Sequence, residues 1–251
     1  MVFFFLMISD KQCGSRSLQR YHFFMETQVL ARKLCIFAPM IKNLIFDMGG
    51  VVFSLGYEQA IRRFEEIGLS DARRLLDPCV QTGLFGDLEG GLISCEDFRR
   101  ELSSLVGKEL SWEECAYAWK GYILDVPQRN LDKLLELRSR GYRTVLLSNT
   151  NPFITAWAHS PEFSLTASDR EPGRPMDDYF DHLYFSCDLK MMKPGEAIFR
   201  HVLEAEGFLP EETLFIDDGE RNVATAARLG IHTLCPQGNS DWTGPIEDYL
   251  K

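Results

Sequence analysis

The chain has 251 residues, of which 45% are hydrophobic, so it can bury a full core as one large domain or as one domain with an insertion. Its formal net charge of −10 disfavours nucleic acid as a partner, because phosphate backbones attract clustered Lys and Arg. Its seven cysteines and five histidines are dispersed, which favours reduced thiols in a cytoplasmic protein over a disulfide framework or a zinc site.

Residues 1–39 are expected to be an N-terminal extension. The opening stretch MVFFFLMIS is apolar, but it has no basic region before it, no A-x-A-like site soon after it, and too few residues to span a bilayer. Secretion is therefore not favoured. We interpret the segment as a disordered extension or as a start placed too far upstream, with a docking helix as the alternative. No other stretch up to Lys251 approaches membrane length, so no membrane partner is expected.

The first predicted strand ends in an acidic residue. In IKNLIFDMGGVVFS, an apolar run from Leu44 to Phe46 leads into Asp47, Gly49 and Gly50. Such a run predicts a buried parallel strand, at whose carboxyl end open α/β sheets bind their ligands. The glycines would let the backbone approach a ligand closely. Asp47 is thus a candidate site residue, although an Asp at a strand end is also a common helix cap or turn former.

Residues 55–126 are predicted to be helical throughout. Apolar residues recur at helical spacing before Gly68 and after Ser94, and Ser111 with Glu114 forms a capping-box pattern. We expect these apolar residues to form the core of a small bundle: Tyr57, Ala60, Ile61, Phe64, Ile67, Phe98, Leu102, Leu105, Trp112, Cys115, Ala116 and Trp119.

From Pro127 onward, strand and helix patterns alternate, which predicts a parallel sheet covered by helices. The first helix is expected between Pro127 and Gly141. The stretch 152–179, with its Ser, Pro and charged residues, is interpreted as a surface insertion or a partly helical excursion. Its Trp157 and His159 are expected in packing or surface positions, with substrate contact as the alternative.

Polar residues end three of these later apolar runs. Ser148 and Asn149 offer a hydroxyl and amides to a phosphate oxygen. Lys193 is a compact cation that can offset phosphate charge. Asp217 and Asp218 are adjacent carboxylates, which are costly unless a metal or a proton offsets their charge. The pair predicts a hard divalent cation, magnesium.

The motifs FDMGGVV, LSNTN, DLKMMKP, HVLEAEGF and FIDDGERN, in this order, resemble those of the haloacid dehalogenase superfamily over roughly residues 41–234. The likeness is closest to its bacterial phosphatases that hydrolyse glucose 1-phosphate. It implies an α/β fold, with a doubly wound parallel sheet of Rossmann-like type and a small all-helical cap domain. It places a catalytic core at 40–54 and 127–251 and the cap at 55–126.

The resemblance also implies a mechanism, in which the first Asp attacks phosphorus and water hydrolyses the aspartyl phosphate. Asp47 is then the nucleophile. The implied metal ligands are Asp47, the Gly49 carbonyl and Asp218, with Asp217 supporting the metal from an adjacent position. The implied phosphate-binding residues are Ser148, Asn149 and Lys193, and Asn222 replaces a frequent carboxylate in the outer shell of the metal. In the cap, the segment 84–94 with Asp87 and Glu89 is the candidate specificity loop, or else an ordinary interhelical turn.

Position 49 departs from the common superfamily pattern, which has a second Asp there as general acid and base. The glucose 1-phosphate type also carries Gly at this place. The missing group could cost roughly 10²–10⁴ in rate. Either an anomeric phosphate leaves as a more acidic hydroxyl, or a cap carboxylate such as Asp87 or Glu89 supplies the proton.

We therefore predict a magnesium-dependent phosphatase acting on small phosphorylated metabolites, sugar phosphates such as glucose 1-phosphate foremost. The alternative is a phosphosugar-binding or regulatory protein whose turnover is weak or lost because of Gly49. A 2-haloacid dehalogenase is disfavoured, because it uses the same nucleophile without the metal pair. A response-regulator receiver is disfavoured because its acidic pair precedes the acceptor Asp. The oligomeric state is left open.

Overall fold

The computed structural model describes residues 40–76, 83–166 and 172–250. The predicted N-terminal extension therefore lies outside the described residues. In the described part of the chain, no helix combines the length and the apolar character that a membrane crossing requires.

A five-stranded parallel sheet is the centre of the fold, in the order β5-β4-β1-β6-β7. The first strand, β1, is central, and Ile45 lies between Val145 and Phe215 of its two neighbours. The strands are β1 (Asn43–Phe46), β4 (Arg143–Ser148), β5 (His182–Phe185), β6 (Thr213–Ile216) and β7 (His232–Leu234). The predicted parallel sheet is confirmed.

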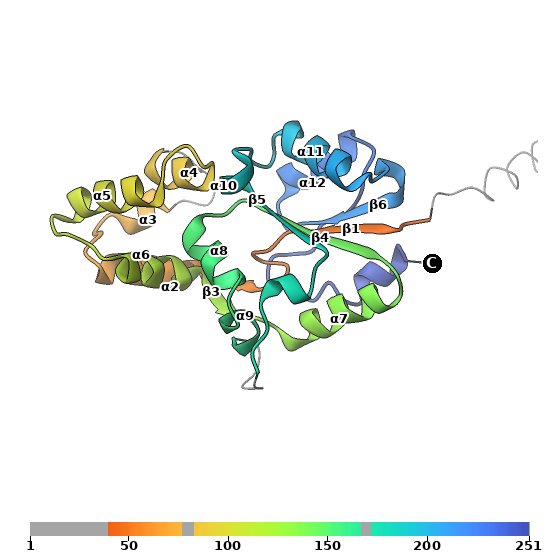
Figure 1. Ribbon diagram of the computed structural model, residues 1–251, viewed down its shortest axis with the longest axis horizontal. Coiled ribbons are helices and arrows are strands. Elements are labelled where there is room, and N and C mark those ends of the chain that lie inside the picture. The colour runs from red at the N-terminus through yellow and green to blue at the C-terminus, as the bar shows by residue number, and fades with distance from the viewer. Residues whose placement is uncertain (1–39, 77–82, 167–171, 251) are drawn as a thin grey trace, which may run out of the picture. The chain divides into compact units, whose positions relative to one another are not determined.

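Alternate residues of the central strands enter two separate apolar clusters, because successive side chains of a strand point to opposite faces. One face packs against α11 (Glu196–Glu206) and α12 (Glu220–Arg228). The other packs against α7 (Gln128–Ser139) and the 3₁₀ helix η5 (Pro245–Asp248). Figure 1 shows these two helical layers on opposite sides of the sheet. The sheet is therefore doubly wound, as the resemblance implied.

Between β1 and α7 the chain forms a helical cap. It contains α2 (Tyr57–Glu66), α3 (Ala72–Leu75), α4 (Gly83–Glu89), α5 (Cys95–Val106), α6 (Trp112–Trp119) and the 3₁₀ helix η2 (Lys120–Tyr122). The segments that enter and leave the cap pair as a short antiparallel ribbon of β2 (Ser54–Leu55) and β3 (Ile123–Asp125). The division of the chain into domains at these two segments stays a prediction.

Aromatic side chains fill the interior of the cap. Phe85 contacts Phe64, Phe98 and Trp119 with ring centroids 5.4–5.7 Å apart, and Phe64 and Phe98 are fully buried. Most of the predicted bundle residues are buried or partly buried, but Leu105 is 58% exposed and Trp112 is 43% exposed. Trp112 lies against Phe153 of the core instead, at 4.3 Å between ring centroids. It thus packs at the boundary of the cap and not inside it.

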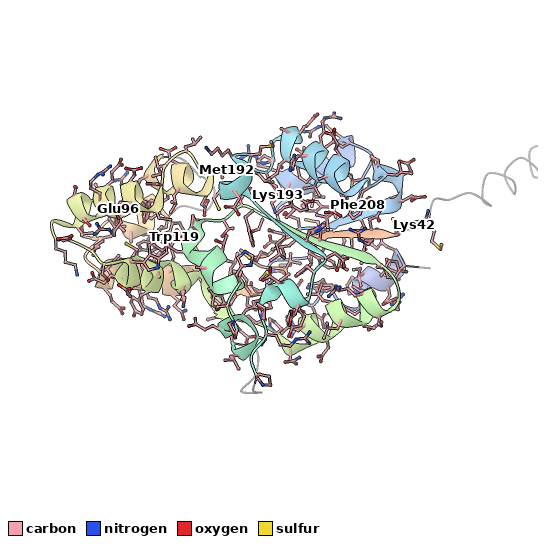
Figure 2. The ribbon with its side chains drawn as sticks, viewed as in Figure 1. Lys42, Glu96, Trp119, Met192, Lys193 and Phe208 are labelled. Carbon is pink, nitrogen blue, oxygen red and sulfur yellow. The ribbon has the colours of Figure 1, made fainter. Side chains whose placement is uncertain are left out.

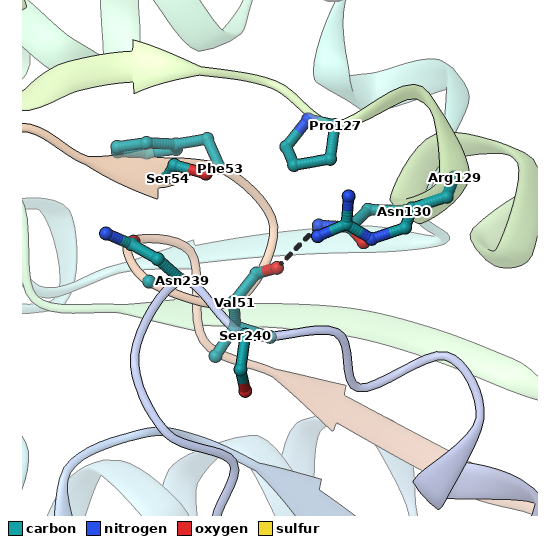
Figure 3. Close-up of a pocket in the computed structure, with 9 residues that line it drawn as sticks. Val51, Phe53, Ser54, Pro127, Arg129, Asn130, Asn239 and Ser240 are labelled. Carbon is teal, nitrogen blue, oxygen red and sulfur yellow. Dashed lines mark hydrogen bonds between the residues drawn. The ribbon is translucent and has the colours of Figure 1, made fainter.

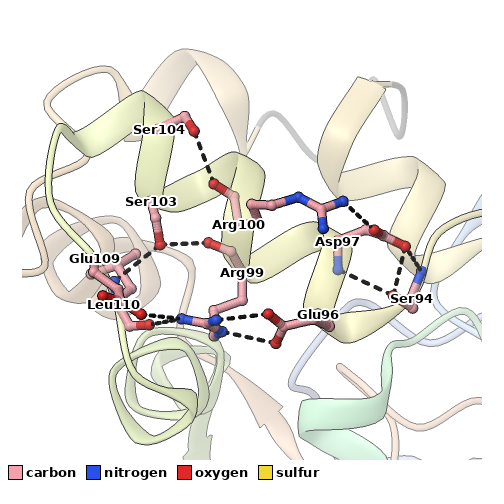
Figure 4. A network of polar contacts seen from close by, with 9 residues as sticks. All are labelled: Ser94, Glu96, Asp97, Arg99, Arg100, Ser103, Ser104, Glu109 and Leu110. Atoms are coloured by element: carbon pink, nitrogen blue, oxygen red, sulfur yellow. Dashed lines mark hydrogen bonds and ion pairs between the residues drawn. The ribbon is translucent and has the colours of Figure 1, made fainter.

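Reciprocal hydrogen bonds begin two of the cap helices. The predicted box at Ser111 and Glu114 is present at the start of α6. A second box, between Ser94 and Asp97, begins α5 (Figure 4). In the same network, Arg99 of α5 donates to the carbonyl oxygen of Leu110 at 2.6 Å. That bond fixes the turn between the two helices, because it satisfies a carbonyl outside them.

The stretch 152–179 is partly helical, as the second of its two interpretations expected, and is not a surface insertion. It forms α8 (Pro152–Ala158), α9 (Glu162–Leu165) and the 3₁₀ helix η3 (Met176–Asp178), and residues 167–171 within it are outside the described part. Phe153, Trp157 and Phe163 are buried, and Trp157 packs on Phe53 at 5.5 Å. The Ser, Pro and charged residues of the stretch did not indicate that one side of it is apolar and buried.

Among the described cysteines, Cys95, Cys115, Cys187 and Cys235 are free thiols. Burial raises the pKa of Cys115 to about 11 and that of Cys187 to about 12, so both stay protonated near neutral pH. Cys115 and Cys187 therefore behave as packing groups.

We expect Phe98→Ala to lower the free energy of unfolding by about 3–5 kcal/mol, because it leaves a cavity between Phe85 and Trp119. Leu105→Ala is the matched control on the same helix and should change it by no more than about 0.5 kcal/mol. Urea unfolding measures both, and equal losses in the two variants would contradict the assignment of the cap interior.

Candidate functional site

Three carboxylates gather at the carboxyl end of the sheet. Asp47 follows β1, and Asp217 and Asp218 follow β6, its hydrogen-bonded neighbour. Because Phe46 and Ile216 are in register, the residues after them lie side by side. Each of the three carboxylates offers an oxygen within 4.8 Å of the others. The three residues predicted as the nucleophile and the acidic pair are thus in one place.

Lys193 lies buried among these acids, with 1% of its side chain exposed. Its Nζ donates to Oδ1 of Asp47 at 2.8 Å, to Oδ2 of Asp217 at 2.7 Å and to the carbonyl oxygen of Leu147 at 2.8 Å. All three ammonium protons are therefore used. Burial alone would lower the pKa of Lys193, but the charges of Asp217 and Asp47 raise it above its ordinary value, so the side chain is an ammonium.

Both carboxylate oxygens of Asp217 accept hydrogen bonds. Its Oδ1 accepts from the backbone N–H of Gly219 at 2.7 Å, and the amide of Asn222 donates to both oxygens at 3.0 and 3.1 Å. With Lys193 on Oδ2, this carboxylate is held in one orientation. Asp217 is placed to orient its neighbours.

Asp218 has a different environment. No side chain of the described residues donates a hydrogen bond to it, and its Oδ2 lies close to two glycine backbones. If Gly50 had a Cβ atom, that atom would lie 2.2 Å from Oδ2 of Asp218. A Cβ atom on Gly238 would lie 2.6 Å from the same oxygen. Gly50 also has φ of +78°, which other residues rarely adopt. Asp218 is therefore the carboxylate of the pair with oxygens available to a ligand.

Burial and the excess of negative charge raise the pKa values of Asp47 and Asp218. Burial, opposed by Lys193 and reinforced by the charges of Asp217 and Asp218, raises the pKa of Asp47 to about 7. Burial and then the charge of Asp217 raise the pKa of Asp218. Three carboxylates share one ammonium, so the cluster is deficient in positive charge. Hard oxygen donors with excess negative charge fit a divalent cation such as magnesium.

Ser148 is the last residue of β4 and Asn149 follows it, beside β1 on the side away from β6. Asn149 and the backbone of Lys193 exchange two hydrogen bonds, at 2.8 and 2.9 Å. The side chain of Asn149 thus holds the lysine segment in place, and its predicted part in phosphate binding stays a prediction. Ser148 is buried, and within the described residues its hydroxyl makes one long contact, of 3.4 Å, with the carbonyl oxygen of Asn149.

Asp87 and Glu89 lie on α4, not on a loop as expected. The predicted segment 84–94 is helical up to Glu89, because 83–89 packs Phe85 and Leu88 into the cap interior. The end of α4 contacts α10 (Ser186–Leu189), where Ser186 donates to the carbonyl oxygen of Glu89 at 2.6 Å. Burial and then the charge of Glu89 raise the pKa of Tyr122, so these two side chains are near each other.

The turn after β7 belongs to the site, although no motif indicated it. Asn239 donates its backbone N–H to the carbonyl oxygen of Gly50 at 2.9 Å, and Gly238 borders Asp218. The only signal in the sequence is the Gly-Asn pair, which is typical of a turn. A shallow hollow lies beside this turn and is lined by residues that include Arg129, Asn130 and Asn239 (Figure 3). Its lining does not include any of the three clustered carboxylates.

The chain is similar to a known protein family and to a named phosphatase. Residues 41–230 match the family of haloacid dehalogenase-like hydrolases. The chain is 43% identical over 203 residues to a D-ribitol-5-phosphate phosphatase of Bacteroides thetaiotaomicron, which covers 81% of this chain and 95% of that protein.

Two solved structures are also similar. One is a predicted haloacid dehalogenase-like hydrolase of Porphyromonas gingivalis, with 45% identity, a TM-score of 0.78, and coverage of 84% of this chain and 98% of that one. The other is an enzyme of the same family from Bacteroides thetaiotaomicron in complex with magnesium and inorganic phosphate. It has 36% identity, a TM-score of 0.72, and coverage of 82% of this chain and 98% of that one.

Asp47→Asn should stabilise the metal-free protein at pH 8. The pKa of about 7 in the fold exceeds the value of about 3.9 of an exposed Asp. Between these two values the folded state binds more protons than the unfolded state, so wild-type stability falls as pH rises. An Asn can still accept from Lys193 but carries no charge.

At pH 8 we expect the melting temperature of this variant to exceed that of the wild type by about 2–4 °C for each 1 kcal/mol of repulsion relieved. This difference in melting temperature should shrink as the pH is lowered toward 4. Asp132→Asn, which alters an exposed carboxylate of α7, is the control. Thermal melts in EDTA in which the wild type is the more stable protein at pH 8 would contradict the charge assignment.

Proposed function

Because this chain belongs to the haloacid dehalogenase-like hydrolases, we propose that it is a magnesium-dependent phosphatase of small phosphomonoesters, sugar and polyol phosphates foremost. The observation that carries the proposal is the pairing of Asp47 with the buried Lys193 beside Asp217 and Asp218. A carboxylate nucleophile and a phosphate dianion repel each other unless positive charge lies between them. The named relative and the magnesium and phosphate complex support this chemistry.

Asp47 is the proposed nucleophile. Lys193 and the backbone N–H of Met48 both donate to its Oδ1, at 2.8 and 2.7 Å, which leaves Oδ2 free of hydrogen bonds from the described residues. An oxygen of Asp47 attacks phosphorus, the bond from phosphorus to the leaving oxygen breaks, and that oxygen takes a proton from water or from a carboxylic acid of the cap. Water then attacks the aspartyl phosphate and releases inorganic phosphate, which regenerates the carboxylate.

Magnesium is the proposed cofactor. Asp47, Asp218 and the Gly49 carbonyl are the residues that would hold it, and Asp217 would support them. When bound, it neutralises charge on the phosphoryl group and orients it. Ser148 and Lys193 are proposed to bind the phosphoryl oxygens, with Asn149 holding the lysine segment.

The helical cap, residues 55–126, is proposed to select the substrate. The finer proposal for that substrate is glucose 1-phosphate, while the named relative acts on ribitol 5-phosphate. A second candidate function, a phosphosugar-binding or regulatory protein with weak turnover, is favoured only by Gly49. We also propose a cytoplasmic location, which the free thiols support.

Asp47→Asn should reduce phosphate release by at least about 10⁴-fold, because it removes the nucleophile, while circular dichroism stays unchanged. Asp132→Asn should retain full activity. Phosphate release from a panel of sugar and polyol phosphates, with magnesium and with EDTA, measures this. An Asp47→Asn enzyme with most of its activity, or a wild type that is equally active in EDTA, would exclude the mechanism.

Asp218→Asn should weaken magnesium binding sharply, because this carboxylate has oxygens available to a cation. Isothermal titration with magnesium chloride measures the affinity, and Asp132→Asn is again the control. Wild-type affinity in the Asp218 variant would refute its assignment as a ligand.

The substrate test compares glucose 1-phosphate, glucose 6-phosphate and ribitol 5-phosphate. If the enzyme depends on an acidic leaving group, the anomeric phosphate should be the best substrate, because it needs the least proton donation. If a cap carboxylate donates the proton, Asp87→Asn or Glu89→Gln should slow the two primary phosphates most, by about 10²–10⁴. Equal rates on all three, unaffected by both substitutions, would exclude both explanations of Gly49.

A further inference from the structure

A side chain at position 49 would meet the side chain of Leu55 and not the backbone of a neighbouring residue. A Cβ atom built on Gly49 would lie 2.9 Å from Cδ2 of Leu55, 3.2 Å from its Cγ and 3.3 Å from its Cδ1. Gly49 is not among the glycines with positive φ, in contrast to Gly50. Its backbone therefore admits other residues, and the isobutyl group of Leu55 occupies the space that their side chains would need.

Leu55 is fixed in this position by Asn239. The backbone N–H of Leu55 donates to Oδ1 of Asn239 at 2.7 Å, and Nδ2 of Asn239 donates to the carbonyl oxygen of Leu55 at 3.1 Å. The backbone of Asn239 in turn donates to Gly50. One residue, through its side chain and its backbone N–H, thus joins the strand that enters the cap to the loop that carries the nucleophile. Figure 3 shows Asn239 beside this loop.

The side chain of Leu55 is 37% exposed, although it packs on a residue only two positions from Asp47. A large apolar side chain that stays partly exposed while it packs on the loop of the proposed nucleophile is available to contact a bound molecule. It can neither donate a proton nor accept one. The wall that Leu55 forms over Gly49 is therefore apolar.

We propose that Leu55, positioned by Asn239, is a specificity-determining residue that fills the place of a side chain at position 49 and contacts the leaving group of the phosphate ester. The inference rests on the proposed phosphatase function. Contact with an apolar wall selects among leaving groups by their shape and apolar surface, and it gives the departing oxygen no protein proton at this position. That oxygen takes its proton from water.

The contact is tested first without any activity assay, by a double-mutant cycle on Gly49→Ala and Leu55→Ala. Gly49→Ala alone should lower the melting temperature by at least about 2–4 °C, because it overpacks the contact with Leu55. In the double variant most of this loss should disappear. Purely additive shifts in melting temperature would overturn the claim that Leu55 requires the glycine.

The specificity role is tested by the ratio of kcat/KM for glucose 1-phosphate and ribitol 5-phosphate. Leu55→Ala should change this ratio by about 10-fold or more, because an apolar contact of this size contributes about 10–200-fold to discrimination. Leu124→Ala is the matched control, since Leu124 lies on the partner strand β3 and is 56% exposed. An unchanged ratio in Leu55→Ala, or an equal change in Leu124→Ala, would overturn the role.

The positioning role of Asn239 has its own variants. Asn239→Gly keeps access to the φ of +64° found at this position but removes both bonds to Leu55, so it should shift the substrate ratio in the same direction as Leu55→Ala. Asn239→Asp keeps the acceptor for the Leu55 N–H and should restore part of the wild-type ratio. A loss of stability without a change of ratio would show a merely structural role and contradict the proposal.

The two proposals fail in different ways. A wild type that releases no phosphate from any substrate would refute the phosphatase function, and with it the contact with a leaving group. Coupling between positions 49 and 55 in the melting temperature would still support the packing contact. An active wild type without that coupling would refute only the present inference.

Discussion

The ammonium group of Lys193 is the interaction on which the site depends. It is buried, it uses all three protons, and two of them bind carboxylates from different strands, Asp47 after β1 and Asp217 after β6. Without this charge, the repulsion between the two carboxylates would be uncompensated in a medium of low dielectric constant. One ammonium does not offset three carboxylates, however. The remaining negative charge is a physical reason for the cluster to bind a cation and, through it, a phosphate ester.

The sheet provides the rigid frame for this charge arrangement. The central strand β1 is paired on both sides, so Phe46 is in register with Leu146 and Ile216 at once. The residues that follow three adjacent strands therefore meet at one edge. Two asparagines hold the cluster in place by hydrogen bonds. Asn149 bonds to the backbone of Lys193, and Asn222 bonds to the carboxylate of Asp217. The strands that carry the reacting groups are buried, and Lys193 and Asp217 are fully hydrogen-bonded within the protein.

The cap is joined to this frame through apolar packing and through two short strands. The apolar cluster on one face of the sheet continues into the cap, where Phe153 of α8 contacts both Phe98 and Trp112. On the other side, the end of α4 is held against α10 through Ser186. The β2 segment carries Leu55 to Gly49, and Asn239 fixes it there. The same contacts that anchor the cap thus shape the wall next to the nucleophile.

The order of motifs along the chain, with apolar runs that end in Asp47, Ser148, Lys193 and Asp217, was sufficient to predict the parallel sheet, the helical cap and the members of the charged cluster. These features are local, because strand and helix patterns and the residues at their ends can be read within a few positions. The amphipathic character of 152–179, the helical state of Asp87 and Glu89, and the outward positions of Leu105 and Trp112 could not be read in this way. They depend on which surface each segment packs against, and that surface comes from distant parts of the chain. Asn239 and Leu55 are the clearest case, since the two residues are far apart in sequence and no pattern near either indicates the contact. Local chemistry determined which groups the site contains, whereas tertiary packing decided how they are oriented and which side chain lies against Gly49.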